Sequence, residues 1–164
     1  MQPVSVLGAC ETRSPCGVKA EGNVTSMDKR TGMSATIVRN KGRLFLLTGL
    51  SGSGKGTLGH LLVTHLNQHG VRPAFLLDGD AARTFFGNDL GFSPVDRDAM
   101  TRRMAFAAKT LTDNGIDVVM ANIAGASATR CFLREKFAEY IEVFLDVDLQ
   151  TLVEHDVKGV YRNN

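Results

Sequence analysis

The sequence predicts an α/β fold with three layers, in which a mostly parallel central sheet carries helices on both faces. From Gly42 onward, short and nearly continuous apolar runs alternate with segments in which apolar residues recur every three or four positions. Strands buried on both faces show such runs, and helical segments between them are typical of parallel sheets. A glycine-rich stretch also lies directly between the first apolar run and the first helical segment. It therefore falls at the carboxyl end of a strand, where parallel sheets bind their ligands.

The expected elements follow one another closely along the chain. The expected strands are residues 43–48, 72–78, 116–123 and 140–146, and the expected helices are residues 55–69, 81–86, 94–113, 126–137 and 149–156. Gly70 occupies the position of a helix-ending glycine, and Pro73 is tolerated only at the beginning of a strand. Ser93 and Pro94 have the character of an N-cap and a first helical residue, and Asn114–Gly115 end the helix that they open. These signals indicate that residues 41–164 form one domain of alternating strands and helices.

Residues 1–40 differ from this domain, because glycine, proline, serine and threonine are scattered through them without a sustained period. We expect a disordered or weakly ordered extension there. Met1, Met27 and Met33 are alternative starts of translation, and the sequence does not choose among them.

Composition excludes several classes of partner. The chain has 164 residues, a net charge of +2 and a pI of about 8.5, a mild excess that suits anionic small molecules and gives no indication of nucleic-acid binding. No apolar run approaches the ~20 residues of a membrane helix, so no membrane partner is expected. Cys10, Cys16 and Cys131 lack metal-binding spacing and are expected to be reduced thiols of a cytoplasmic protein. The oligomeric state stays open, a homodimer being one alternative.

The glycine-rich stretch has the residues and spacing of a phosphate-binding loop. It comprises Gly49, Ser51, Gly52, Ser53, Gly54, Lys55, Gly56 and Thr57, with Leu50 after the first glycine. Its glycines allow successive backbone N–H groups to point inward, and the start of the following helix adds partial positive charge. We expect the Lys55 ammonium to bind the β- and γ-phosphates of ATP and to stabilise the transferring phosphoryl group. A flexible turn, the alternative, does not explain the flanking strand and helix. The expected fold is therefore the P-loop NTPase fold.

One position of the loop departs from the usual motif. Gly56 occupies the place at which the motif has a serine or threonine for Mg²⁺. The hydroxyl follows one residue later, in Thr57, which we expect to help position phosphate or metal. The run from Gly52 to Thr57 also resembles the loop of adenylate kinases, in which water and nucleotide oxygens largely hold the metal. Weaker direct coordination of Mg²⁺ by the protein is therefore expected.

Two carboxylates, Asp78 and Asp80, stand where the second expected strand ends. In the functional interpretation, one orients or deprotonates an acceptor hydroxyl and the other helps to hold Mg²⁺, for which Asp80 is the candidate. In the alternative interpretation they only cap a helix and form a turn, as aspartate often does. The phosphate loop one strand away favours the functional interpretation, because perturbed acids gather at such rims.

A cluster of basic residues follows the acids, and it consists of Arg83, Arg97, Arg102, Arg103 and Lys109. Such groups bind the oxygens of an anionic acceptor, although a solvated helix face is the alternative. Arg102 and Arg103 point about 100° apart on a helix, so one of the two is expected to be structural. Phe92 either stacks on a base of the acceptor or fills the core.

Together these segments resemble the adenylyl-sulfate kinase family, which phosphorylates the 3′-hydroxyl of adenosine 5′-phosphosulfate in sulfate activation. The matching runs, spread over about residues 42–164, are Gly49–Lys55, Leu77–Asp80 with Arg83, Asp89–Ser93 with Asp96–Arg97 and Arg102–Arg103, and Asp156–Tyr161. The resemblance implies that the loop binds ATP, that Asp78 and Asp80 serve Mg²⁺ and catalysis, and that the substrate is a small anionic nucleotide. It also implies that Arg83 and Arg97 contact this nucleotide and that Phe92 stacks on its adenine.

The departures from the family gather on the acceptor side, at Ala81, Ala99, Met100, Ala124, Gly125 and Ala126. A further departure, His155, falls in a region that helps to hold the ATP adenine in the family. The family has a substrate-contacting asparagine in place of Met100, and a serine and a proline in place of Ala124 and Gly125. Two alternatives therefore stay open: a kinase for a different anionic nucleotide or small-molecule acceptor, and a non-catalytic nucleotide-binding relative. The family continues beyond Asn164 with a lid and a last strand, which we expect residues 41–164 to lack, by truncation or by nature.

Overall fold

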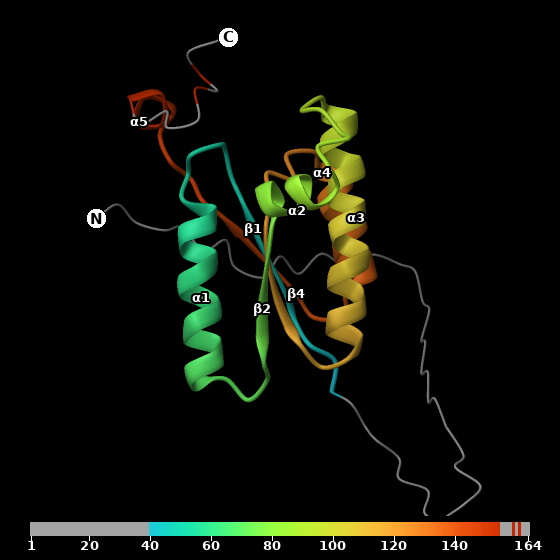
Figure 1. Cartoon of the computed structure of the whole chain (residues 1–164). Helices are drawn as coiled ribbons and strands as arrows, with labels where there is room; N and C mark the ends of the chain where they lie inside the picture. Colours follow the sequence, from blue (N-terminus) through green and yellow to red (C-terminus); the bar gives the residue numbers. More distant parts are fainter. Residues whose placement is uncertain (1–39, 155–158, 160, 162–164) are drawn as a thin grey trace, which may run out of the picture.

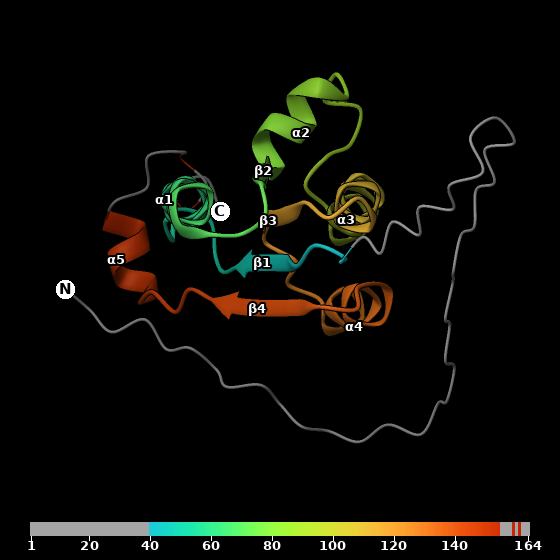
Figure 2. The same cartoon turned by 90° about the horizontal axis from the view of Figure 1, so that it is seen from below.

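The computed structural model describes residues 40–154, 159 and 161 of the chain. Its elements are β1 (Leu44–Thr48), α1 (Lys55–His69), β2 (Ala74–Asp78), α2 (Gly79–Phe85), α3 (Pro94–Asp113), β3 (Asp117–Ala121), α4 (Ser127–Lys136), β4 (Tyr140–Phe144) and α5 (Leu149–Glu154) (Figure 1). The four strands pair in parallel in the order β2-β3-β1-β4. Helix α1 lies on one face of the sheet, and α3 and α4 lie on the other (Figure 2). The predicted three-layer α/β fold is confirmed.

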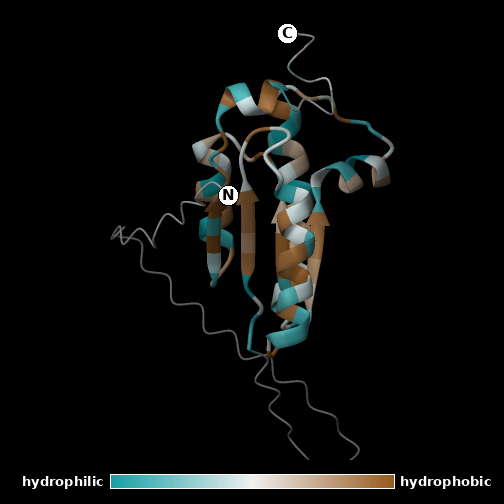
Figure 3. Ribbon diagram, turned by 90° about the vertical axis from the view of Figure 1, so that its left-hand side faces the viewer, coloured by the Kyte–Doolittle hydropathy of each residue, from teal (hydrophilic) through white to brown (hydrophobic). Residues whose placement is uncertain are grey.

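The two faces of the sheet carry separate apolar cores, because successive side chains of a strand point to opposite faces. Leu44 and Leu46 of β1 pack with residues of α3 and α4, whereas Phe45 and Leu47 pack against residues of α1. All five residues of β1 and all five of β3 are buried. Figure 3 accordingly shows hydrophobic strands in the centre of the molecule and helices in which hydrophilic and hydrophobic segments alternate.

Local signals predicted the helix boundaries well. Helices α1 and α3 begin and end at the predicted residues, and the Ser93 hydroxyl accepts the predicted capping hydrogen bond from the Asp96 N–H. Helix α2 begins at Gly79, two residues before the prediction, because the Asp78 carboxylate accepts from the Asp80 and Ala81 N–H groups. Strand β3 ends at Ala121 instead of residue 123, and the last residues of the apolar run turn into the site described below.

The opposite end of the sheet is fixed by a buried carboxylate. Asp117 begins β3, and its side chain is 1% exposed. The Arg43 N–H donates to Asp117 Oδ1 over 2.8 Å, and the Arg43 Nε donates to Asp117 Oδ2 over 3.1 Å. The Arg72 guanidinium lies 3.9 Å away. A buried charge is tolerated only with such partners, so this group aligns β1 with β3.

Several sequence-based expectations lie outside the described residues, namely those for the extension up to residue 39 and for Cys10, Cys16, Met27, Met33 and His155. Cys131, on α4, is exposed and has a free thiol. None of the helices between residues 40 and 154 has both the length and the apolar character needed to cross a bilayer.

Candidate active site

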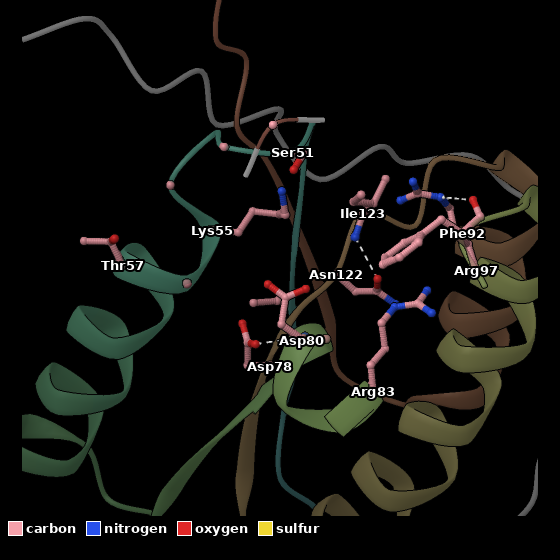
Figure 4. Close-up of a pocket in the computed structure, with 16 residues that line it drawn as sticks. Ser51, Lys55, Thr57, Asp78, Asp80, Arg83, Phe92, Arg97, Asn122 and Ile123 are labelled. Atoms are coloured by element: carbon pink, nitrogen blue, oxygen red, sulfur yellow. Dashed lines mark hydrogen bonds between the residues drawn. The ribbon is translucent and has the colours of Figure 1, made fainter. Parts of the chain in front are cut away.

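A cavity of about 820 Å³ opens at the carboxyl end of the sheet. It is lined by the loop after β1, by α2, by the segment between α2 and α3, by the first turn of α3 and by the residues that follow β3 (Figure 4). The sequence predicted that the carboxyl ends of the strands would form one binding rim, and the cavity lies at this rim.

The loop between β1 and α1 has a backbone that requires glycine. Gly49, Gly52 and Gly54 have φ angles of 148°, 77° and 87°, which side chains other than hydrogen disfavour. A Cβ at position 49 would also lie 2.8 Å from the Leu145 carbonyl oxygen. Gly54 precedes the first residue of α1, and no side chain of the described residues caps this helix start. The N–H groups of the first turn are therefore suited to bind phosphate oxygens.

Lys55 turns back over this loop. Its Nζ donates to the Gly49 carbonyl over 3.0 Å, to the Leu50 carbonyl over 2.5 Å and to the Ser53 hydroxyl over 3.3 Å. These bonds hold the ammonium at the centre of the loop curvature, where a bound phosphate would replace weak carbonyl partners with a charge-assisted bond. The Tyr161 hydroxyl donates to the Ser51 carbonyl over 2.9 Å, a contact that the local pattern of the loop did not indicate.

The two residues after the lysine, Gly56 and Thr57, face different parts of the site. The exposed Thr57 lies apart from Lys55 and Asp80, although it lines the same cavity (Figure 4). Position 56 faces the acids instead, because a Cβ there would lie 3.7 Å from Asp78 Oδ2. Because residue 56 is glycine, this chain has no hydroxyl at the position from which the motif serine would reach a metal ion.

The two carboxylates at the end of β2 have distinct surroundings. Asp78 Oδ1 accepts from the N–H groups of Asp80 and Ala81 over 2.9 Å and 3.1 Å, and so caps α2. Asp80 stands in the first turn of α2 and points toward Lys55 (Figure 4). The predicted capping role therefore applies only to Oδ1 of Asp78. Its Oδ2 faces position 56, and both Asp78 and Asp80 line the cavity.

These residues fit a magnesium ion that is bound mainly by its nucleotide. Mg²⁺ in phosphate-transfer sites takes one or two carboxylates and completes its shell with phosphate oxygens and water. Asp78 and Asp80 supply two such carboxylates beside the phosphate loop. No group of three or more acidic, histidine or cysteine residues suited to a metal occurs in the part of the chain that the structure describes.

The half of the cavity away from the phosphate loop is built around Phe92. This side chain is 67% exposed, so the structure excludes a core role for it. The Cζ atoms of Arg83 and Arg97 lie 4.6 Å and 5.6 Å from its ring centroid. Arg83 Nη1 donates to the carbonyls of Leu90 and Gly91 over 3.0 Å and 2.7 Å, and Arg97 Nε donates to the Phe92 carbonyl over 2.8 Å. The two guanidinium groups thereby position an aromatic ring and two positive charges at one wall.

The other basic residues of α3 are held by ion pairs. Arg102 Nε donates to Asp98 over 2.7 Å, and Arg103 makes two bonds of 2.8 Å to Asp89. Lys109 pairs with Asp113. The sequence predicted one structural arginine between Arg102 and Arg103, and both belong to such pairs. The Thr129 hydroxyl and Arg102 lower the pKa of Asp98, because both donate to its carboxylate.

Two residues at the end of β3, Asn122 and Ile123, also line the cavity. From the sequence, the rule for parallel sheets places Asn122–Ala126 at the binding rim, but no role was predicted for either residue. The available signal was a polar side chain at the carboxyl end of a buried apolar run. The Ile123 carbonyl accepts from the Thr48 hydroxyl, and this bond joins the ends of β1 and β3 beneath the site.

The parallel sheet, the phosphate loop after β1 and the paired acids after β2 define the class of the protein, an α/β P-loop kinase fold. The chain belongs to the adenylylsulphate kinase family, whose model matches residues 41–164. The resemblance seen in the sequence is thereby confirmed.

Individual relatives agree with this assignment. A probable adenylyl-sulfate kinase of Pseudomonas aeruginosa is 40% identical over 126 residues, which are 77% of this chain and 58% of the relative. An adenylyl-sulfate kinase of Synechococcus sp. (strain JA-3-3Ab) is 43% identical over 115 residues, 70% of this chain and 65% of the relative. The chain thus spans about three fifths of the length of these relatives. The APS kinase of Mycobacterium tuberculosis, solved with AMPPNP and APS, has a TM-score of 0.69 and 35% identity, with 76% of this chain and 73% of that one covered.

Proposed function

We propose that residues 41–164 act as one kinase domain that transfers the γ-phosphoryl group of ATP to the 3′-hydroxyl of adenosine 5′-phosphosulfate. One observation carries this proposal: the phosphate loop and the pair of arginines around Phe92 line the same cavity, with Asp80 between them (Figure 4). A P-loop supplies the site for the donor, and an aromatic ring flanked by guanidinium groups suits a nucleotide that carries negative charge. The free thiol of Cys131 suits the reducing cytoplasm, where we place the reaction.

Each residue has a role in the proposed transfer. The amides of the loop and the Lys55 ammonium neutralise the oxygens of the transferring group, which is the main source of catalysis in such reactions. Asp80 orients the acceptor hydroxyl and takes its proton as the oxygen bonds to phosphorus and the bond to ADP breaks. Asp78 holds the first turn of α2, and thereby Asp80, in place. Bound Mg²⁺ would neutralise charge on the phosphates. It would be held by the nucleotide and by Asp78 and Asp80, and Thr57 would help to position phosphate or metal at the loop.

A second candidate is a kinase for a different anionic acceptor. Met100 stands where the family has a substrate-contacting asparagine, and it is 1% exposed in the core between β3 and α3. It therefore offers no polar group to a ligand. Ala124 is 4% exposed and has a φ angle of 40°. These two positions favour an altered acceptor pocket beside an intact phosphate loop.

A coupled ADP-release assay with Mg-ATP, run with and without adenosine 5′-phosphosulfate, tests the proposal. We expect ADP release to depend on that acceptor and to be lost in Asp80→Asn, whose affinity for ATP should stay near that of the native protein. ATP binding in calorimetry without stimulation by adenosine 5′-phosphosulfate would instead support the second candidate, and a panel of nucleotides would then identify the acceptor. Undiminished transfer by Asp80→Asn would contradict the role given to Asp80.

A further inference from the structure

Asn122 holds its side chain amide in the acceptor half of the cavity by two hydrogen bonds. It directly follows β3 and is half-buried. Its Nδ2 donates to the Thr101 hydroxyl oxygen over 2.7 Å, and its Oδ1 accepts from the Ile123 N–H over 2.8 Å. Figure 4 shows this amide between Ile123 and Arg83.

The hydrogen bonds of its neighbours determine which way this amide points. The Thr101 hydroxyl donates its single proton to the Arg97 carbonyl over 2.8 Å, so toward Asn122 it can only accept. The Ile123 N–H can only donate. The NH₂ group of Asn122 must therefore face Thr101, and its oxygen must face Ile123.

This arrangement leaves one N–H of Asn122 Nδ2 without a partner among the described residues, in a group that lines the cavity. The two existing bonds immobilise the side chain before any ligand binds, so a third bond costs little further rotamer entropy. A bond chain also runs from Asn122 through Thr101 to Arg97, which flanks Phe92. The amide therefore has a defined place relative to the aromatic wall.

We propose that Asn122 donates this N–H to an oxygen of the acceptor nucleotide and is a specificity-determining residue of the kinase. The inference rests on the proposed function. A fixed donor in a half-buried site discriminates strongly, because an acceptor without the matching oxygen leaves the donor unpaired.

The test compares Asn122→Leu with a matched control, Asn67→Leu. Asn67 lies on α1 outside the cavity and also makes two amide bonds, donating to the Ala74 carbonyl over 3.2 Å and accepting from the Ala74 N–H over 2.8 Å. Both variants lose a doubly bonded amide, which is half-buried in Asn122 and belongs to an exposed residue in Asn67, so both should lower the melting temperature. We expect only Asn122→Leu to raise KM for the acceptor, by about tenfold or more, with KM for ATP changed less than twofold. Thr101→Val, which frees the amide to rotate, should give a smaller increase.

An unchanged acceptor KM in a folded Asn122→Leu protein, or an equal increase in Asn67→Leu, would overturn the proposal. If Asn122→Leu does not fold, Asn122→Asp replaces it, because the carboxylate still accepts from the Ile123 N–H while the donor is lost. If the native protein shows no acceptor-dependent ADP release, the proposed function fails, and calorimetry with adenosine 5′-phosphosulfate then decides about Asn122. Binding that weakens about tenfold in the variant would sustain the role in recognition, and unchanged or absent binding would refute it.

Discussion

The two halves of the cavity are built in different ways. The donor half, residues 49–57, is a backbone structure in which glycine conformations and the start of α1 create the site. The acceptor half, defined by Arg83, Phe92, Arg97 and Asn122, is made of side chains from four segments, namely α2, the connection from α2 to α3, α3 and the residues after β3. In the donor half, Lys55 bonds to atoms at most six residues away. In the acceptor half, Asn122 bonds to Thr101, which is 21 residues away.

This difference indicates where the two halves are sensitive. A backbone site changes little when neighbouring side chains change, because its donors are main-chain N–H groups. A side-chain site depends on every partner that orients its members. The departures from the family at Ala81, Ala99, Met100, Ala124 and Gly125 all lie outside the phosphate loop, and we infer that the acceptor half can change its ligand while the donor half is retained.

The largest effect is expected in the donor half, from Lys55→Ala. Removing one preorganised charge from the transferring group should lower kcat/KM by about 10²- to 10³-fold, as measured in the coupled assay. Lys109→Ala is the control, because Lys109 pairs with Asp113 away from the cavity. If kcat/KM of Lys55→Ala falls less than tenfold, the backbone N–H groups of the loop are sufficient for the function of the donor half.

The next effect concerns the acceptor half, in Arg97→Ala. A hydrogen bond to a charged group contributes about 1.5–3 kcal/mol, so KM for the acceptor should rise about 10- to 100-fold. KM for ATP should stay nearly constant. Arg102→Ala, on the same helix and paired with Asp98, should leave both constants unchanged. Equal effects of Arg97→Ala on both substrates would contradict the division into two halves.

A smaller effect should come from outside the cavity, through Arg130. Its Nη1 donates to the carbonyls of Ala124 and Gly125 over 3.0 Å and 2.7 Å, and its Nε lies 3.0 Å from Glu142. Arg130→Gln should loosen the turn after β3. Because Arg130 acts on the cavity only through this turn, the acceptor KM should rise by only about two- to tenfold, the net effect of a typical hydrogen bond.

Arg134 offers a control for this prediction, because it bonds to the same Glu142 over 3.1 Å. None of its hydrogen bonds between described residues reaches the turn. Arg134→Gln should therefore leave the acceptor KM unchanged. If both variants raise it equally, the effect comes from Glu142 and β4 and not from the turn.

The smallest effect is a dependence of stability on pH. The pKa of Asp98 is lowered by a hydrogen bond from Thr129, which links α3 to α4, and by a hydrogen bond from Arg102 within α3. A lowered pKa in the folded state means that the carboxylate stabilises the fold above its ordinary pKa of about 3.9 and loses this contribution as the pH falls through the folded value. The melting temperature of Asp98→Asn should lie below that of the native protein at pH 7, and the difference should shrink below about pH 4. A difference independent of pH would contradict this assignment.

The helices and the loop could be predicted from local residues. Gly54 precedes α1 with a φ angle of 87°, Ser93 caps α3 through its hydroxyl, and Gly70 follows α1 where a Cβ would lie 2.3 Å from the Leu66 carbonyl oxygen; α1 and α3 have the expected boundaries. The end of β3 could not be predicted in this way. Asn122 and Ile123 continue an apolar run in the sequence, but they leave the sheet and bond to Thr101 and Thr48.

The sequence by itself determined the fold class, the family and the donor half, because hydrophobic period, glycine spacing and the lysine after the loop act over a few residues. Only the tertiary structure decided the acceptor half. It exposed Phe92 between two arginines, held Arg102 and Arg103 in ion pairs, and brought Asn122 into the cavity. The physical reason is that a side chain takes its role from the partner that it meets in space, and these partners come from other elements of the fold.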